Sequence, residues 1–228
     1  MNALSAALIA TLRDTVGELG ARADIRALVL TGGGRAFCSG ADLRDPGMMS
    51  LDAPPAERAR LLSERFDSNL NAMMRAFHGF ARPKVVAVNG PAVGGGAGLA
   101  LVGDIVLAAR TAYFAFPFTP QLGLIPDMGA SWQLARRLGR ARALGLALLG
   151  ERLSAEDAER WGLIWRAVDD DALMGETMTI ARRLADGPPQ AMALLPGCID
   201  AAVANSFDAQ LDLERDLQGR LAASEDFI

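Results

Sequence analysis

The chain has 228 residues, 51% of them hydrophobic and 22% charged, and this balance predicts one well-packed globular domain rather than a disordered chain. The formal net charge is −4 and the basic residues are dispersed, which argues against nucleic acid as a partner. Cys38 and Cys198 lie far apart and suggest neither a disulfide framework nor a metal site, so a cytoplasmic protein is expected.

The sequence predicts alternating helices and strands in the first half of the chain. In chain order we expect a helix at 4–19 capped by Ser5, a strand at 25–30, a glycine-rich loop at 31–42, a helix at 55–77 and a buried strand at 84–88. The uncharged run 85–103 is long enough to raise the question of a membrane span. It contains Asn89, Pro91 and a glycine cluster, which disfavour a lipid-exposed helix, so we predict buried core and no membrane partner.

Helices dominate the second half. The predicted elements are a turn at the glycine triplet 94–96 leading into a helix at 97–102, strands at 105–108 and 113–116, helices at 129–138, 141–149 and 154–161, a strand at 164–168, a helix at 171–185 and a last pair of helices within 189–223. No linker or composition break divides the chain, which favours a single domain over 1–228. Basic residues cluster on one predicted helix face, which we expect to be solvated: Arg136, Arg137, Arg140 and Arg142.

The glycine triplet follows a buried strand and opens a helix, where consecutive backbone N–H groups can point at one place and bind an anion. It matches neither the dinucleotide-binding nor the P-loop pattern. The alternative is that the glycines allow a helix to pack closely on a strand.

Two glycine-rich loops and a later turn together form a specific pattern. They read Phe-Cys-Ser-Gly-Ala-Asp-Leu at 37–43, Asn-Gly-Pro-Ala-Val-Gly-Gly-Gly at 89–96 and Gly-Leu-Ile-Pro at 123–126. The set resembles the crotonase, or enoyl-CoA hydratase/isomerase, superfamily over nearly the whole chain. The resemblance implies an α/β crotonase-like (ClpP/crotonase) fold of repeated ββα units, with a spiral core at 1–170 and a C-terminal helical association region at 171–228. It also implies an acyl-CoA thioester as the substrate, a homotrimer or homohexamer, and no cofactor besides the coenzyme A of the substrate.

In this family each loop offers one backbone N–H to the thioester oxygen, and matching by position gives Ala41 and Gly95 as the donors of an oxyanion hole. Two preorganised donors stabilise the enolate that forms when a proton leaves the carbon next to a thioester, and losing one typically costs ~3 kcal/mol of barrier. The resemblance further implies that coenzyme A contacts the first loop. The expected substrate-binding residues of the two loops are Ser39, Gly40, Asp42, Leu43 and Gly94.

The carboxylates separate the reactions of the family. Hydratases carry two glutamates, and the matching positions here hold Gly98 and the uncharged stretch around Phe118. Asp127 stands where double-bond-shifting members, including the 1,2-epoxyphenylacetyl-CoA isomerase branch that the chain most resembles, carry their catalytic carboxylate. We therefore predict an isomerase in which Asp127 moves one proton in an apolar pocket that includes Phe118, Leu122 and Trp132. The alternative role for Asp127 is to cap the helix that starts near Gly129.

Three further residues are considered for chemical roles. Cys38 is expected in the core, Asp104 in a structural role, and His78 at a helix end rather than in a serine peptidase triad. A hydratase or hydrolase in which Asp127 activates water, and a non-catalytic acyl-CoA-binding subunit, stay open as alternatives. Compared with the family, the sequence begins after the usual first strands and ends before the usual last helix.

Overall fold

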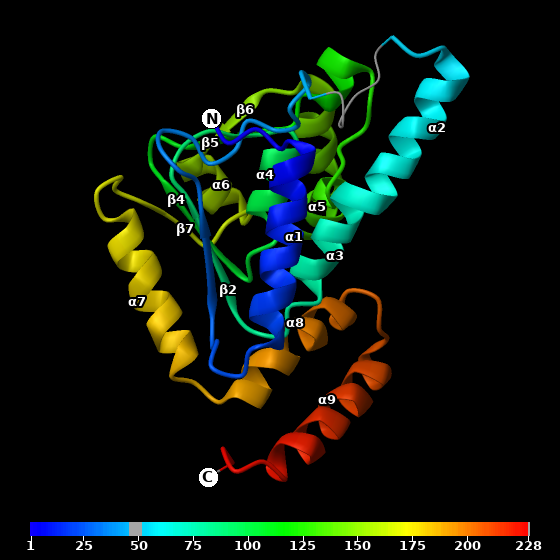
Figure 1. Ribbon diagram of the computed structural model, residues 1–228. Coiled ribbons are helices and arrows are strands. Elements are labelled where there is room, and N and C mark those ends of the chain that lie inside the picture. The colour runs from blue at the N-terminus through cyan, green and yellow to red at the C-terminus, as the bar shows by residue number, and fades with distance from the viewer. Residues whose placement is uncertain (46–51, 228) are drawn as a thin grey trace.

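The computed structural model describes residues 1–45 and 52–227, and Figure 1 shows strands at its centre with helices around them. The elements are α1 (Ala6–Ala21), β1 (Leu28–Thr31), α2 (Pro55–Arg65), the π-helical η1 (Phe66–Asn71), α3 (Ala72–His78), β2 (Lys84–Val88), β3 (Ala92–Val93), α4 (Gly95–Ala100), β4 (Ile105–Ala109), β5 (Tyr113–Ala115), the π-helical η2 (Phe118–Leu122), α5 (Ala130–Leu149), β6 (Arg152–Ser154), α6 (Ala155–Trp161), β7 (Arg166–Val168), α7 (Leu173–Ala185), α8 (Pro189–Ala202) and α9 (Phe207–Ala222).

The strands form two sheets. The first is entirely parallel in the order β1-β2-β4-β7, with Val86 of β2 opposite Val106 of β4. The second has the order β3-β5-β6, in which β3 and β5 are parallel and β5 and β6 antiparallel. Twice in succession the chain runs from a strand of the first sheet to a strand of the second and then into a helix, as β2-β3-α4 and β4-β5-α5. This path is the ββα repeat that the sequence predicted.

Apolar residues of the parallel strands form the centre of the core. Every residue of β2 is buried, as are Val106 to Ala109 of β4, because helices cover the sheet. Helix α7 packs against β1, β2 and β4, while α1 packs against α3. Helices α8 and α9 extend away from the sheets at the C-terminal end, as Figure 1 shows in orange and red.

Most predicted elements are present, with changes at particular points. Ser5 and Ser154 cap α1 and α6 by accepting hydrogen bonds from backbone N–H groups three residues later. The helix predicted at 55–77 is interrupted by η1, and the two helices predicted within 129–149 meet in α5 at Gly139, whose φ of 73° is not helical. Strands β3 and β6 were not predicted: β3 lies within the glycine-rich loop 89–96, and β6 directly precedes α6.

The prediction of a solvated basic face is wrong for one of its four arginines. Arg137 is half-buried and donates to the carbonyl oxygens of Leu163 (3.0 Å), Leu101 (3.0 Å) and Gly103 (3.3 Å). Burial lowers the pKa of its guanidinium below the usual value, and Asp104 and Asp200 oppose that change. Arg137 therefore ties α5 to the segment that follows α4.

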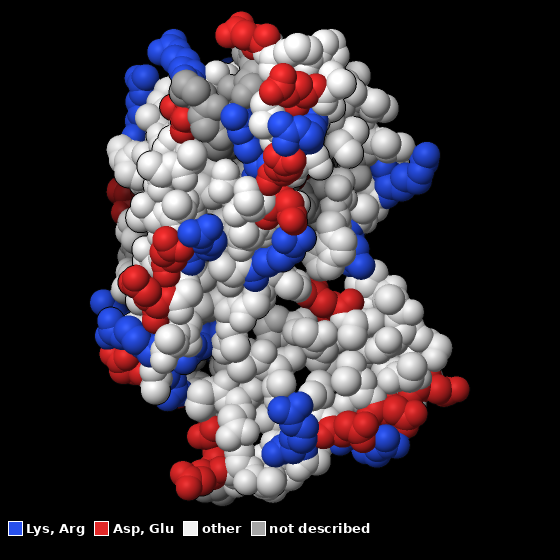
Figure 2. All heavy atoms as spheres, turned by 45° about the vertical axis from the view of Figure 1, so that its right-hand side comes forward, with Lys and Arg blue, Asp and Glu red and all other residues white. Residues whose placement is uncertain are grey.

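The remaining surface charge is mixed. On the face shown in Figure 2, Lys and Arg side chains lie among Asp and Glu side chains. Across residues 1–45 and 52–227, none of the helices combines the length and apolar character needed to cross a membrane.

Candidate active site

Hydrogen bonds join the two glycine-rich loops side by side. The N–H of Val93 donates to the carbonyl of Cys38 (2.9 Å), and the N–H of Phe37 donates to the carbonyl of Pro91 (3.1 Å). Asn89 adds a side-chain link to the start of the first loop. Its amide nitrogen donates to the carbonyls of Gly32 (2.9 Å) and Gly34 (2.8 Å), and its amide oxygen accepts from the N–H of Gly32 (3.2 Å). The loops are thus fixed relative to each other before any ligand binds.

Close backbone approach explains the glycines at the loop junction. Gly40 has a φ of 89°, and a Cβ there would lie 2.9 Å from the carbonyl oxygen of Val93 and 3.6 Å from the nitrogen of Gly95. Gly94 has a φ of 57° and donates its N–H to the carbonyl of Ala115 (2.9 Å). Both positive φ values favour glycine. Gly40 is therefore next to the N–H that begins α4.

The two predicted donors have free N–H groups. Within residues 1–45 and 52–227, the N–H groups of Ala41 and Gly95 have no acceptor in the chain. The neighbouring groups are used, since Gly40 accepts a hydrogen bond from Leu4 (2.8 Å) and Asp42 donates one to the carbonyl of Leu4 (3.0 Å). Helix α4 has only six residues, so the N–H groups themselves, more than a helix dipole, are what this site offers an oxyanion.

The other first-loop residues lie beside these donors with varied exposure. Ser39 is half-buried and its N–H donates to the carbonyl of Met1 (3.1 Å). The side chain of Asp42 accepts from the N–H of Arg44 (3.1 Å), so it shapes the local turn. Leu43 is exposed. These three residues adjoin Gly40 and Ala41 in the chain, and their contact with coenzyme A stays a prediction.

Asp127 lies against the start of α4. A Cβ added to Gly95 would lie 3.6 Å from its Oδ1. That Oδ1 is buried and has no hydrogen-bond partner among the described residues. Burial raises the pKa of the carboxyl from its ordinary 3.8 to about 7, opposed by a hydrogen bond from its own backbone N–H. A carboxyl group with this pKa can both accept and release a proton near neutral pH.

The capping role considered for Asp127 is wrong for its side chain. Helix α5 has Gly129 at its N-cap position, with a φ of 72°, and no side chain caps it. Only the backbone of Asp127 takes part, because its carbonyl accepts from the N–H of Ala130 (2.8 Å). The carboxyl group of Asp127 therefore does not cap α5 and is available for proton transfer.

Met128 is a site residue that the sequence indicated only as part of an apolar stretch. It is buried and has a φ of 51°, which is uncommon for a side chain of this size. A Cβ on Gly95 would lie 2.8 Å from its Sδ, and a Cβ on Gly98 would lie 2.9 Å from its Cβ. Met128 thus fills the face of α4 that these two glycines form, and the glycine at 98 is required for that fit.

The predicted pocket residues differ in their burial and in their contacts. Phe118 is buried, and its Cζ would lie 3.8 Å from a Cβ on Gly94. Leu122 is exposed at the end of η2. Trp132 packs with its ring edge to the ring of His78, 6.3 Å between centroids, and the Arg136 guanidinium lies 3.9 Å above it. The structure thus brings Phe118 to the loops, while the contacts of Trp132 are with α3 and α5.

Comparison with known proteins shows the family of the chain. The family model described as enoyl-CoA hydratase/isomerase matches residues 1–227. The chain belongs to the enoyl-CoA hydratase/isomerase family. Its α/β fold is shared with a solved enoyl-CoA hydratase from Polaromonas sp. JS666, with a TM-score of 0.87, 32% identity and coverage of 97% of this chain and 83% of that one. The fold predicted from the loops is therefore confirmed.

Relatives within the family carry the names of two different reactions. The 1,2-epoxyphenylacetyl-CoA isomerase of Escherichia coli (strain K12) is 44% identical over 227 residues, covering 100% of this chain and 84% of that protein. A protein of Rhodobacter capsulatus named "Probable enoyl-CoA hydratase" is 43% identical over the same length and shares. Identities this close do not separate an isomerase from a hydratase.

The structure also places Cys38 and Asp104, the two other residues considered for chemical roles. Cys38 is buried, as predicted, and burial raises the pKa of its thiol. Asp104 accepts a hydrogen bond from the N–H of Lys84 (2.7 Å) and pairs with its ammonium group (3.1 Å), which agrees with a structural role. Within the described residues, no group of three or more His, Cys, Asp and Glu side chains is arranged to hold a metal ion.

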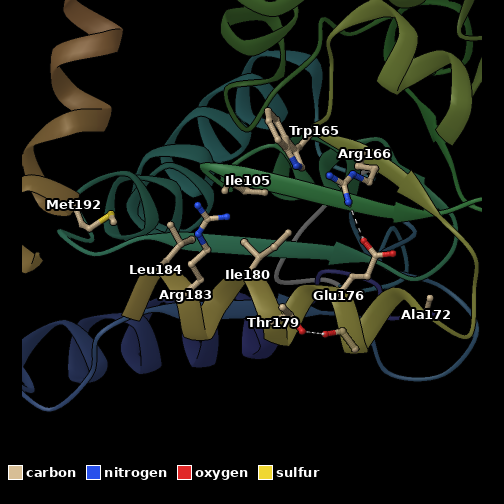
Figure 3. Close-up of a pocket in the computed structure, with 11 residues that line it drawn as sticks. Ile105, Trp165, Arg166, Ala172, Glu176, Thr179, Ile180, Arg183, Leu184 and Met192 are labelled. Carbon is tan, nitrogen blue, oxygen red and sulfur yellow. Dashed lines mark hydrogen bonds and ion pairs between the residues drawn. The ribbon is translucent and has the colours of Figure 1, made fainter. Parts of the chain in front are cut away.

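A separate cleft of about 770 Å³ lies between α7 and strands β4 and β7. Figure 3 shows Arg166 and Glu176 meeting across it, 3.2 Å apart, with Trp165 at its upper rim. Both members of this ion pair are partly exposed to solvent, and none of the predicted site residues lines the cleft. Its one acid is therefore a weaker acid–base candidate than Asp127.

Proposed function

We propose that this protein is an acyl-CoA isomerase that moves a double bond, or isomerises a ring epoxide, by proton transfer through one carboxylate. The observation that carries the proposal is the buried Oδ1 of Asp127, which lies 3.6 Å from where a Cβ on Gly95 would stand and has no hydrogen-bond partner among the described residues. A buried carboxyl oxygen without a hydrogen-bond partner destabilises a protein, so its presence at this place supports a functional role.

In the double-bond reaction, the thioester oxygen accepts hydrogen bonds from the N–H groups of Ala41 and Gly95. The ionised Asp127 removes a proton from the carbon between the thioester carbonyl and the double bond, and the electrons of that C–H bond pass into a dienolate. The protonated Asp127 then returns the proton to the far carbon of the conjugated system. The substrate gains and loses no atoms, so this route needs one acid–base group and no water.

Two features favour this single-carboxylate route over hydration. The position of one hydratase glutamate is held by Gly98, against which Met128 is packed. The region of the second holds Phe118, which is buried. Neither place supplies a second carboxylate, so the two-acid positioning of water that hydration uses has no counterpart at these two positions.

The test is turnover of 3-enoyl-CoA, dienoyl-CoA and epoxyphenylacetyl-CoA by the wild type and by Asp127→Asn. We expect the variant to lose about 10²- to 10⁴-fold in turnover, while acyl-CoA affinity changes only a few-fold. Asp171→Asn is the matched control, because Asp171 is exposed on the surface. Unchanged turnover in Asp127→Asn would refute the mechanism.

Hydration or hydrolysis is the second candidate, favoured by the 43% identity to the Rhodobacter capsulatus protein. In that case Asp127 activates water, and the product gains oxygen from ¹⁸O-labelled water. An isomerase product gains none. Tight acyl-CoA binding without turnover of any tested substrate would instead favour a non-catalytic binding subunit.

We further propose that the protein works in the cytoplasm as a homotrimer or homohexamer assembled through residues 171–228. Several large apolar side chains of α8 and α9 are exposed, as expected of an association surface: Leu195, Ile199, Phe207 and Leu211. Light scattering coupled to size exclusion tests this assembly. Ile199→Glu is expected to give smaller particles, and a wild type that stays monomeric at high concentration would refute the proposal.

A further inference from the structure

Met128 occupies a strained backbone position that a glycine would occupy more easily. Its φ is 51° and that of the following Gly129 is 72°. A side chain in this region costs of order 1 kcal/mol, and such strain persists only where the surroundings impose it. The contacts of the Met128 side chain therefore hold the backbone in this conformation.

The surroundings of that side chain lead to the Asp127 carboxyl. The Sδ of Met128 and the Oδ1 of Asp127 both approach the Cα of Gly95, where an added Cβ would lie 2.8 Å and 3.6 Å from them. The Cβ of Met128 meets Gly98 one turn later in α4. One buried thioether side chain thus fixes the loop of Asp127 onto the helix that begins with the Gly95 N–H.

We propose that Met128 is a positioning residue whose side chain locks onto Gly95 and Gly98, holds the Asp127 carboxyl beside the Gly95 N–H and keeps water away from it. The inference rests on the proposed function, which it deepens. The thioether offers Asp127 no strong hydrogen bond, so its effect on the carboxyl is exclusion of solvent.

The electrostatic setting fits this role. Among the described residues, the pKa of Asp127 responds to burial and to its own backbone N–H, with no contribution from a charged side chain. Helix α4 contains no titratable residue, and the other side chain that meets Gly95 is the apolar Leu4. Admitting water where Met128 now packs would therefore lower the pKa of Asp127 towards its ordinary value.

The experiment compares the wild type with Met128→Gly and Met128→Leu. Glycine accepts the positive φ and opens the space, whereas leucine keeps a side chain of similar volume. The carboxyl pKa of Asp127 is read by ¹³C NMR of protein labelled at aspartate, with the resonance identified by its loss in Asp127→Asn. The pH profile of kcat/KM is measured on the same proteins.

We expect Met128→Gly to lower the Asp127 pKa by at least about one unit and to move the acidic limb of the kcat/KM profile to lower pH by the same amount. Turnover on the plateau of the profile should fall about tenfold. Met128→Leu should retain the wild-type pKa and limb. Met128→Ala keeps the Cβ against Gly98 and loses the thioether. The Asp127 pKa in this variant should therefore lie between the values in Met128→Gly and Met128→Leu.

An Asp127 pKa that is the same in the wild type, Met128→Gly and Met128→Ala would overturn the inference. That failure differs from failure of the proposed function, for which Asp127→Asn would retain its turnover. The NMR titration reads the positioning role without reference to any substrate.

Discussion

Replacing Asp127 by asparagine should stabilise the folded protein at alkaline pH while it removes activity. The folded state raises the pKa of this carboxyl from 3.8 to about 7, so the folded protein holds the proton more tightly than the unfolded chain. The free energy of unfolding therefore falls as the pH rises from about 4 to about 7, and the full penalty is present above that range. A shift of about three pKa units corresponds to ~4 kcal/mol, an upper bound because water relaxes around a partly exposed side chain.

The assay is urea unfolding followed by tryptophan fluorescence at about pH 5.5 and about pH 8.5, with the protein concentration held fixed. The stability gained by Asp127→Asn should be ~2 kcal/mol larger at the higher pH, because the wild type then carries a buried, ionised carboxylate. Any cost of burying the asparagine amide is the same at both pH values and cancels in this difference. Asp171→Asn should change stability by less than about 0.5 kcal/mol at either pH. An equal gain at the two pH values would refute the claim that burial sets the proton affinity of Asp127.

Three further substitutions test the scaffold of the site. Asn89→Ala removes three hydrogen bonds between the loops and should lower the free energy of unfolding by ~1–3 kcal/mol in urea titrations, with turnover falling more than acyl-CoA affinity. Gly98→Ala should destabilise by ~1–3 kcal/mol in the same assay, because its Cβ would lie 2.9 Å from that of Met128. Arg137→Met leaves three carbonyls without their donor and should lower the melting temperature by several degrees in calorimetry.

The two central strands of the parallel sheet could be predicted from the sequence because they are almost entirely buried. Residues 84–88 and 105–108 are apolar runs apart from Lys84, and the structure places β2 and β4 there. Strands β3 and β6 could not be found in this way. β3 lies within a glycine-rich loop and β6 directly precedes α6, and both are strands through their pairing with β5 on either side.

The site was predicted unevenly for a related reason. Resemblance to the family implied roles for Ala41, Gly95 and Asp127 from the positions of their motifs, and these roles stay predictions. Nothing in the sequence indicates that Met128 adopts a positive φ, because methionine rarely does so. The burial of the Asp127 carboxyl is a property of the folded chain, so the sequence could suggest a raised pKa without showing its cause.

The proposed chemistry requires small residues around the two N–H donors more than it requires particular side chains. Two of the three proposed groups are backbone N–H groups, which any residue except proline supplies. What the residues around them must provide is close approach: a Cβ on Gly40 would meet the backbone of Val93, and one on Gly95 would meet Met128. Larger residues at these two positions should therefore remove activity by moving the donors, whereas Ala41→Ser should retain it because Ala41 is only partly buried. Asp127 is the exception, since its carboxyl group itself is required.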